Sequence, residues 1–529
     1  MKSMTINRKE SGLFSEQQIK MVYDQEFYSN FMNKPFEIDA FEGQIKSKGE
    51  SFDNESRKVL KNALIQQNTT LNLSEASQIN LDALVNENTF TITTGHQLSL
   101  FTGPLYFVVK ILHVIKMCEE LKVKYPNKKF VPVYWMAAED HDFEEIQSCN
   151  LFNQKITWES DQQGPVGRFD VDGFEEVREK LMDLFSNHQD SEVSKIIDAY
   201  SGKDFAEMTR SLVNEIFGDR GLLIVDGDDR ALKSSFIPVM VKEIEEQFSF
   251  NQVSLTNEKL EKVDAKLQVT SREINLFYIE KGIRQRVEMV DGKFIIEGIG
   301  EYSQEAIIEE INANPERFSP NVILRPVYQE VILPNLAYIG GAGEISYWLQ
   351  LKGVFDALQL PYPMIQVRNS VIWLDSTIIG KLEKFEFAVT DIFKDLDAWK
   401  KEFVQDNAGD ELDFTVLNEQ LKALTDTLKN TILGLDQSKG QFADAEVAKL
   451  SKQIDGVKSK AIKMSKGNHE EVMKAMDQIK SKLFPNNGLQ ERSVNFFQFC
   501  ADGKVSSHVN DLYTMLDPFE KNLILLLAE

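Results

Sequence analysis

Short apolar segments that alternate with helical ones constrain the fold of this chain more than any other feature. FTITT at 90–94 leads through GHQLSLFTGP into the periodic helix LYFVVKILHVIKMCEELK, and FVPVYWMAA at 130–138 begins a second such unit. Further apolar runs occur at 221–229, 321–326 and 336–355. Strands that are apolar on both faces and are separated by helices are typical of a parallel sheet covered on both sides. The predicted fold class is therefore α/β, with a parallel sheet covered on both faces as its core.

The net charge and the length of the chain exclude some classes of partner and indicate how many domains to expect. The chain has 529 residues and a net charge of −24, and its length suggests about three domains. The acidic balance argues against partners such as nucleic acids and anionic membranes, which need clustered lysine and arginine. The first residues lack the apolar stretch of a secretory signal, and the apolar run at 522–528 is far shorter than the ~18 residues that span a bilayer. We expect a cytoplasmic protein without a membrane or nucleic-acid partner.

Three cysteines, Cys118, Cys149 and Cys500, are widely separated and form no CxxC motif. An odd number with this spacing does not match a disulfide framework or a cysteine-rich zinc site. The sequence therefore predicts no zinc and no other metal held by cysteine.

The pattern changes along the chain predict four regions. Residues 1–88 look helical, without a strong strand, and 89–378 form the core, with insertions at about 150–220 and 265–320. Within the second insertion, Asp291-Gly292 between alternating segments is a hairpin signal. Residues 379–484 form a helical arm, and 485–529 return to the core.

Heptad spacing predicts that the arm is an antiparallel coiled-coil hairpin. Apolar residues recur at steps of three or four in two series, which are Phe414, Leu417, Leu421, Leu424, Leu428, Ile432 and Leu435, then Val447, Leu450, Ile454, Val457, Ala461 and Met464. Gly434 and 438–440 lie between the series and could turn the chain. The heptads leave open whether the seam is internal to one hairpin or shared between two chains.

A first candidate site follows the strand at 90–94. Gly95 lets the backbone approach a ligand, His96 could stabilise a phosphoryl transition state or move a proton, and Gln97 precedes a helix start that suits phosphate or carboxylate. The alternative is that these residues only shape a turn.

A second candidate site follows the strand at 130–138. Glu139, Asp140, His141 and Asp142 are four consecutive ionisable groups at the end of a buried strand. Such groups are costly to bury unless they contact a ligand, a cation or each other, so they could hold an amine, a ribose hydroxyl or Mg²⁺. A solvated acidic helix start is the alternative.

A third candidate site is the glycine-rich strand-to-helix turn Gly340-Gly341-Ala342-Gly343-Glu344. It lacks the GxGxxG dinucleotide fingerprint but could still present backbone amides to a phosphate. Arg325 is a candidate clamp for a carboxylate or phosphate. An ordinary surface ion pair is its alternative.

The tetrapeptide at 463–466 spells KMSK, the mobile ATP-binding loop of class I aminoacyl-tRNA synthetases. It falls within the heptads of the arm rather than after a Rossmann strand. Because four-residue matches arise easily by chance, we interpret it as a coincidence.

Together these segments resemble one family, the bacillithiol biosynthesis cysteine-adding enzymes, or BshC family. The resemblance rests on blocks in the same order and of matching length across most of the chain, which are TGHQLSLFTGPLYFVVK, VPVYWMAAEDHDFEEI, FSPNVILRPVYQE, AYIGGAGEISYWLQLKGVF and LFPNNGLQER. Many relatives read TGQQ where this chain has TGHQ, which predicts that His96 is replaceable.

The resemblance implies a class I synthetase-like, nucleotidyltransferase-like Rossmann core and a coiled-coil arm that forms a homodimer. It implies a cysteine ligase that joins L-cysteine to the amine of glucosaminyl-malate in the last step of bacillithiol synthesis. By analogy with related ligases, ATP would activate the cysteine carboxylate as an adenylate, with Mg²⁺ as an option. Related cysteine-activating enzymes bind the thiol through zinc, for which this sequence has no matching cysteine set.

On this basis we predict four groups of site residues. The phosphate or carboxylate site is assigned to Gly95, His96, Gln97 and Gly103, and the acceptor amine to Asp140, His141 and Asp142. The nucleotide or substrate pocket is assigned to Arg325, Gly340, Gly341, Gly343 and Glu344, and a second nucleotide contact near the arm to Gln490 and Arg492. Two other functions stay open, an amide ligase with another amine acceptor and a non-catalytic dimeric scaffold.

Overall fold

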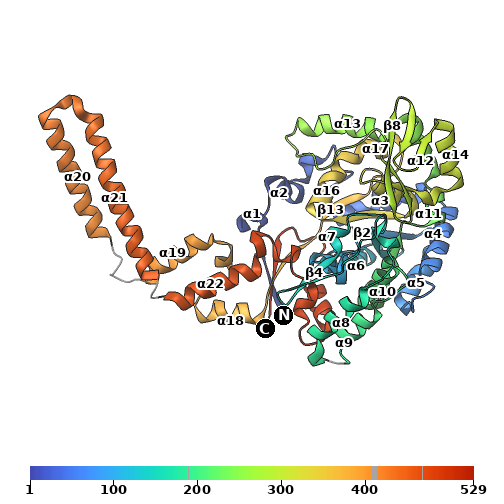
Figure 1. Cartoon of the computed structure of the whole chain (residues 1–529), viewed down its shortest axis with the longest axis horizontal. Coiled ribbons are helices and arrows are strands. Elements are labelled where there is room, and N and C mark those ends of the chain that lie inside the picture. The colour runs from blue at the N-terminus through green and yellow to red at the C-terminus, as the bar shows by residue number, and fades with distance from the viewer. Residues whose placement is uncertain (189, 408–413, 467–468, 529) are drawn as a thin grey trace. The chain divides into compact units, whose positions relative to one another are not determined.

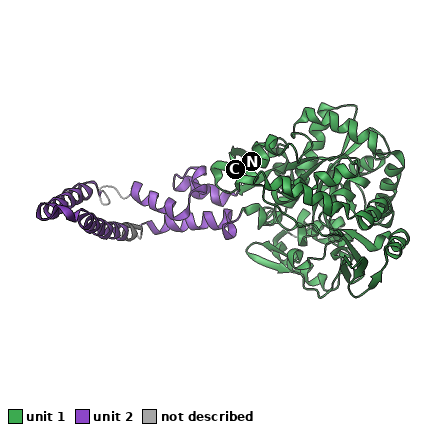
Figure 2. Ribbon diagram, turned by 90° about the horizontal axis from the view of Figure 1, so that it is seen from above, with its two compact units in different colours: residues 1–373, 489–527, 529 green, residues 374–488, 528 purple. Residues whose placement is uncertain are grey.

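The computed structural model describes residues 1–188, 190–407, 414–466 and 469–528 (Figure 1). They form two compact units, coloured separately in Figure 2. The first unit comprises 1–373 and 489–527, and the second comprises 374–488 with Ala528. The chain thus leaves the first unit once and re-enters it for its last forty or so residues.

A five-stranded parallel sheet forms the centre of the first unit. Its strand order is β13-β12-β2-β3-β6, and every neighbouring pair is parallel. The strands are β2 (Thr89–His96), β3 (Lys129–Met136), β6 (Leu223–Asp226), β12 (Asn335–Gly340) and β13 (Met364–Val367). The predicted α/β class with a Rossmann-like parallel sheet is confirmed.

The sheet is parallel because its strands are buried on both faces. In β3, Val131, Val133 and Trp135 belong to one core cluster, whereas Tyr134 and Met136 belong to another on the opposite face. The long helix α6 (Tyr106–Lys124) supplies apolar side chains to the latter cluster. Alternating side chains of one strand therefore fill two cores, which explains why the strands look continuously apolar in the sequence.

Two insertions interrupt the alternation of strands and helices. Between β3 and β6 lie the short helix α7 (Phe143–Ile146), the hairpin of β4 (Ser148–Leu151) and β5 (Gln154–Thr157), and the helices α8 (Phe174–Leu184), α9 (Glu192–Ala199) and α10 (Phe205–Phe217). After β6 comes an antiparallel sheet of order β10-β9-β8-β7-β11. Its strands are β7 (Leu276–Glu280), β8 (Ile283–Val290), β9 (Lys293–Ile296), β10 (Gly300–Tyr302) and β11 (Phe318–Pro320). We refer to this second sheet as the insertion sheet.

The hairpin predicted at Asp291-Gly292 is confirmed in the insertion sheet. Val290 pairs with Lys293 across a two-residue loop. Both loop residues have positive φ, +50° and +76°, which is the conformation that a right-handed strand twist favours and that aspartate and glycine tolerate.

The strand predicted at 321–326 is wrong. β11 ends at Pro320, the Asn321 carboxamide accepts a hydrogen bond from the backbone N–H of Ile323, and Arg325 begins helix α15 (Arg325–Ile332). Pro326 fits the first turn of a helix because its missing N–H is not needed there. A side chain that caps the turn and a proline in the first helical turn thus outweigh the apolar composition of this segment.

Residues 1–88, predicted to be helical without a strong strand, do contain one short strand. β1 (Lys2–Ile6) pairs antiparallel with β15 (Leu523–Leu527), and β14 (Ser370–Leu374) completes a three-stranded sheet. The polar strand β1 is half-exposed and is held by a partner from the other end of the chain. No local pattern reveals such a pairing.

A buried ion pair anchors the C-terminal return to the first unit. The Arg368 guanidinium donates two 2.8 Å hydrogen bonds to the Glu491 carboxylate, which also accepts the backbone N–H of Val371 at 2.9 Å. The neighbouring Gln490 side chain bonds both backbone groups of Trp373. The return is thus fixed by charged and polar side chains that have left water.

The second unit is helical, and the predicted coiled-coil hairpin is confirmed. α20 (Thr415–Leu435) and α21 (Gly440–Lys466) are antiparallel neighbours joined by a short turn, and α18 (Ser376–Lys384), α19 (Leu396–Asn407) and α22 (Glu470–Leu483) complete the unit. The residues at 463–466 are the last four of α21, and their side chains, Met464 included, lie outside the described ones. No described helix is both long and apolar enough to cross a membrane.

Three residues of the predicted seam lie outside it. Leu435, the last residue of α20, is 85% exposed. Leu424 and Val457, within the helices, are 57% and 59% exposed, whereas Thr425 and Ala443 are buried. A straight helix has 3.6 residues per turn rather than 3.5, so a heptad stripe drifts across its surface over several turns. The drift moves these two apolar side chains to the outside of the hairpin.

Replacing Glu491 by glutamine should strongly destabilise the first unit. The Glu491→Gln variant leaves the Arg368 guanidinium buried without its counter-charge, and breaking a buried pair costs about 3–5 kcal/mol. Urea denaturation at pH 7 measures the change. The control Glu16→Gln removes a carboxylate from an exposed pair with Lys20 and should change the free energy of unfolding by less than about 1 kcal/mol. Equal effects of the two variants would contradict this role of the buried pair.

Candidate functional site

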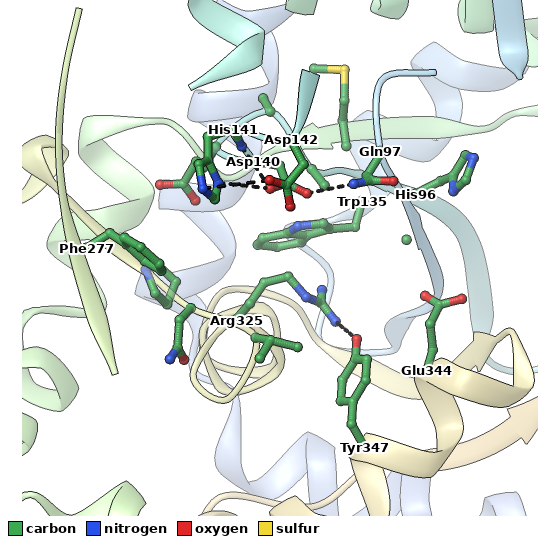
Figure 3. Close-up of a pocket in the computed structure, with 18 of the residues that line it drawn as sticks. His96, Gln97, Trp135, Asp140, His141, Asp142, Phe277, Arg325, Glu344 and Tyr347 are labelled. Carbon is green, nitrogen blue, oxygen red and sulfur yellow. Dashed lines mark hydrogen bonds and ion pairs between the residues drawn. The ribbon is translucent and has the colours of Figure 1, made fainter. Parts of the chain in front are cut away.

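Segments from three strand ends line one cavity of about 690 Å³ (Figure 3). Gly95, His96 and Gln97 come from the end of β2, and 139–142 follow β3. Glu344 comes from α16 (Ala342–Trp348), which follows β12. Because parallel strands have their carboxyl ends at the same edge of the sheet, segments distant in sequence meet here.

A buried lysine that sequence reasoning did not find ties two of these segments together. Lys110 of α6 donates to the Gly95 carbonyl at 2.8 Å and to the Glu344 carboxylate at 2.5 Å. Glu344 also accepts from the Tyr338 hydroxyl and the Gly341 N–H, each at 2.7 Å. Burial alone would raise the pKa of Glu344, but Lys110 and these donors hold it below its usual value. Glu344 is therefore ionised and fixes the β12–α16 turn.

The acidic segment after β3 is organised by hydrogen bonds. Asp140 accepts from the Gln97 carboxamide at 2.9 Å and from the His141 backbone N–H at 2.8 Å. Burial opposes its ionisation, yet these bonds and the nearby Arg284 hold the pKa of Asp140 below its usual value. Arg284 lies 2.7 Å from His141 Nδ1 and donates to it, so the proton of a neutral ring is on Nε2, 3.7 Å from Asp142.

Arg325 supplies a positive charge without a carboxylate partner. Its guanidinium donates to the Tyr347 hydroxyl at 3.3 Å and to Gln329 at 3.2 Å, and it lies near the rings of Trp135 and Tyr338. Among the described side chains, no carboxylate approaches it within 4.0 Å. Burial lowers its pKa, but the two tyrosines outweigh this and raise it. Such a guanidinium suits the carboxylate or phosphate of a ligand.

His96 is neutral at physiological pH. It packs against the rings of Tyr106 and Phe107, and this burial, together with the charge of Lys110, lowers its pKa to about 3. Net positive charge on this side of the cavity therefore comes from Arg325, because the charge of Lys110 is paired with the ionised Glu344. The predicted catalytic role of His96 reduces to hydrogen bonding by an uncharged ring.

The predicted glycines shape the site without lining it. Gly340, Gly341 and Gly343 are absent from the described cavity wall. A Cβ at Gly340 would lie 3.0 Å from the Tyr338 ring, so the glycine permits the close approach of the turn that carries Glu344.

Gly103, Gln490 and Arg492 are likewise not brought to this cavity. Gly103 has φ +63°, and a Cβ there would lie 2.5 Å from Ser99, so a tight turn requires it. The Gln490 carboxamide already bonds the backbone N–H and carbonyl of Trp373, and Arg492 is exposed.

Several lining residues escaped the sequence analysis. Lys110 lies on the apolar side of a helix, which was itself a signal because a buried lysine needs a partner. Arg284 and Arg286 alternate along β8 and so share one face, a pattern visible in GIRQRV. That this face turns toward the Rossmann sheet could not be predicted from the sequence.

Asp140, His141 and Asp142 also form a candidate cation site. Each offers one ligand atom within 4.8 Å of the others. Because Arg284 already occupies His141 Nδ1, the free ligands are the carboxylate oxygens, and oxygen ligands suit Mg²⁺.

The end of β6 adds a second charge network beside the cavity. The buried Lys233 bridges Glu139 at 2.7 Å and Asp228 at 3.1 Å. Asp228 also binds Arg168 through two hydrogen bonds, and although burial opposes it, these cations lower its pKa to about 2. Burial raises the pKa of Asp226 to about 7, although Arg210 lies 3.3 Å away. The pKa values of two aspartates that are two residues apart are thus shifted in opposite directions.

Comparison with known proteins gives consistent matches over the whole chain. The model described as "Bacillithiol biosynthesis BshC, N-terminal Rossmann-like domain" matches residues 1–369, and that of the BshC C-terminal coiled-coil domain matches 371–527. Relatives named "Putative cysteine ligase BshC" include one from Flavobacterium johnsoniae, 39% identical over 98% of both chains, and one from Flavobacterium psychrophilum, 40% identical over 93% of both. A solved tryptophanyl-tRNA synthetase from Plasmodium falciparum covers 93% of this chain and 97% of its own at 11% identity, but its TM-score of 0.24 carries no argument.

Replacing Asp226 by asparagine should change how stability depends on pH. The pKa of Asp226 in the folded chain lies above the 3.8 of an ordinary aspartate, so between these values the folded chain binds more protons and the free energy of unfolding falls as pH rises. Asp226→Asn should remove this fall, up to about 1.4 kcal/mol per pH unit, in urea denaturation between pH 5 and pH 8.

Asp53→Asn is the control for this experiment. Asp53 caps helix α4 (Asn54–Gln67) by accepting from the Ser56 N–H, and this bond lowers its pKa. Its stabilising contribution is lost only in acid, so this variant should not alter the slope between pH 5 and pH 8. Parallel curves for Asp226→Asn and the unchanged chain would contradict the assignment.

Proposed function

From the premise that the chain belongs to the BshC family of bacillithiol biosynthesis, we propose that it is a cysteine ligase that uses ATP. The substrates proposed are L-cysteine, whose carboxylate is activated, and glucosaminyl-malate, whose amine accepts the cysteinyl group. The product is an amide.

The observation that carries this proposal is the separation of opposite charges within one cavity. Figure 3 shows Arg325 on one side of Trp135 and the acidic residues Asp140 and Asp142 on the other. An amino acid carries a carboxylate and an ammonium on neighbouring carbons. A guanidinium without a carboxylate partner and a pair of carboxylates can bind these two groups in one orientation.

In the first step, a carboxylate oxygen of cysteine attacks the α-phosphorus of ATP. An O–P bond forms, the bond to the β-phosphate oxygen breaks, and pyrophosphate leaves with the electron pair. Arg325 and the one N–H of Lys110 not bound to Gly95 or Glu344 neutralise the negative charge that develops on the phosphate oxygens.

In the second step, the acceptor amine attacks the acyl carbon of the cysteinyl adenylate. A C–N bond forms, the C–O bond to AMP breaks, and the nitrogen loses a proton. We assign this proton to the Asp142 carboxylate, which lies 3.7 Å from His141 Nε2 and is half exposed to solvent. His141 itself has no free nitrogen, because Nδ1 accepts from Arg284 and Nε2 carries the ring proton. The buried His96 is not suited to the role because its lowered pKa makes it a weak base.

Cysteine-dependent release of pyrophosphate from ATP tests the first step. Arg325→Met keeps the length of the side chain but removes the charge, and we expect the rate to fall about 100-fold. The control Arg230→Met removes an exposed arginine that pairs with Glu316 away from this cavity, and the rate should stay within about twofold. No cysteine-dependent release by the unchanged chain, or an unaffected rate in Arg325→Met, would refute the proposal.

We also propose that the second unit mediates a homodimer. Leu424 of α20 and Val457 of α21 are more than half exposed although they belong to the heptad series. Exposed apolar residues on a coiled-coil hairpin are suited to contact a second copy.

Light scattering tests this dimer. The double variant Leu424→Glu, Val457→Glu should lower the mass in solution from twice 60.5 kDa to 60.5 kDa, because four charges would be buried at the interface. The control Val123→Glu changes an apolar residue of the first unit that is even more exposed, at 80%, and should leave the mass unchanged. A double variant that keeps the mass of the unchanged chain would rule out this interface.

A further inference from the structure

Three arginines of the insertion sheet and the segment before it form one wall of the cavity. Arg284 and Arg286 lie two residues apart on β8, and Arg272 precedes β7. Val287, of the opposite parity on β8, is buried in the core, which leaves the arginine face toward the cavity. We call Arg272, Arg284 and Arg286 the arginine wall.

An aromatic ring orders two of these guanidinium groups. Phe277 pairs directly with Arg286 across β7 and β8. The guanidinium carbon of Arg284 lies 3.7 Å from the centre of the Phe277 ring, and that of Arg286 lies 5.0 Å from it. Stacking on one ring lowers the number of rotamers that each side chain samples, so less entropy is lost when an anion binds.

The positive charge of the arginine wall has no direct counter-charge. Among the described side chains, no carboxylate lies within 4.0 Å of Arg272, Arg284 or Arg286, although Asp140 and Asp142 attract Arg284 through space. Arg284 Nε is buried and has no hydrogen-bond partner. Three neighbouring cations in a chain of net charge −24, with a buried donor left unsatisfied, favour the binding of an anion.

We propose that the arginine wall is a second anion subsite, which binds the dicarboxylate end of the acceptor and thereby selects it. This subsite rests on the ligase function proposed above. It makes the insertion sheet the element that recognises the acceptor, whereas the Rossmann sheet holds the reacting groups.

The position of the arginine wall favours an acceptor carboxylate over a nucleotide phosphate. Arg284 donates to His141, so the wall directly adjoins the residues assigned to the acceptor amine. Figure 3 shows Phe277 on the far side of Arg325 from Glu344 and Tyr347. The phosphates are assigned to Arg325 and Lys110, on the other side of the cavity. An acceptor with its amine at His141 and Asp142 would place its anionic end against the wall.

The geometry also favours two carboxylates rather than one. Each guanidinium can bind a carboxylate through two parallel hydrogen bonds. Arg284 already gives one N–H to His141, whereas no hydrogen bond among the described side chains uses the exposed Arg286 guanidinium. The remaining donors of Arg272, Arg284 and Arg286 exceed the two that one carboxylate would use, which matches an acceptor that carries two carboxylates.

Calorimetric binding of two acceptors that differ only in the dicarboxylate tests this subsite. The ligands are glucosaminyl-malate and glucosamine, with L-malate and ATP measured separately. Arg286 is exposed, so Arg286→Ala should fold normally, and it should lower the preference for glucosaminyl-malate over glucosamine at least tenfold. The affinity for L-malate should fall by a similar factor. The control Lys293→Ala removes one exposed positive charge of the same sheet and should keep the preference.

The other outcomes separate the two proposals. An Arg286→Ala variant that loses affinity for ATP rather than for L-malate would assign the wall to the nucleotide and overturn the subsite. Unchanged preference would overturn it as well. If the unchanged chain binds L-malate through Arg286 but releases no pyrophosphate with cysteine, the dicarboxylate subsite stands and the ligase function fails.

Discussion

The geometry of the cavity depends on the buried ammonium group of Lys110. Lys110 reaches from α6 to the Gly95 carbonyl at the end of β2 and to Glu344 after β12. It thereby joins three chain segments that are up to about 250 residues apart. A lysine in an apolar core is stable only when paired, so neither the turn after β2 nor that after β12 can move without exposing an unpaired charge. The cavity owes its fixed shape to this constraint.

Charge separation within the cavity follows from the topology. The end of β3 brings acidic residues to one side, and α15 brings Arg325 to another, because each element begins or ends at the same edge of the sheet. Side chains that would attract each other if free are held apart by Trp135 and by their own hydrogen bonds. A ligand that carries a negative and a positive group can pair with the Arg325 guanidinium and with the carboxylates at the same time.

Local patterns sufficed to predict the parallel sheet, the hairpin at Asp291-Gly292 and the meeting of three strand ends. They failed where the determining partner is remote. The strand β1 depends on β15 at the other end of the chain, and the turn at 321–326 depends on capping by Asn321 rather than on apolarity. Lys110 and Arg284 were missed because a side chain's place on a helix or strand does not tell which neighbour it meets. Pairwise packing, rather than periodicity, decides these cases.

The acidic surface gives the arginine wall its importance. A chain of net charge −24 repels an anionic acceptor at long range, although salt weakens this beyond about 8–10 Å. Inside a cavity with low-dielectric walls, the field of a few local cations exceeds that of distant surface carboxylates. Arg284 and Arg286 therefore set the local potential, and stacking on Phe277 keeps them from folding back onto Asp140 and Asp142. The arginine wall thus allows an anion to bind inside the cavity, although the outer surface of this acidic chain repels anions.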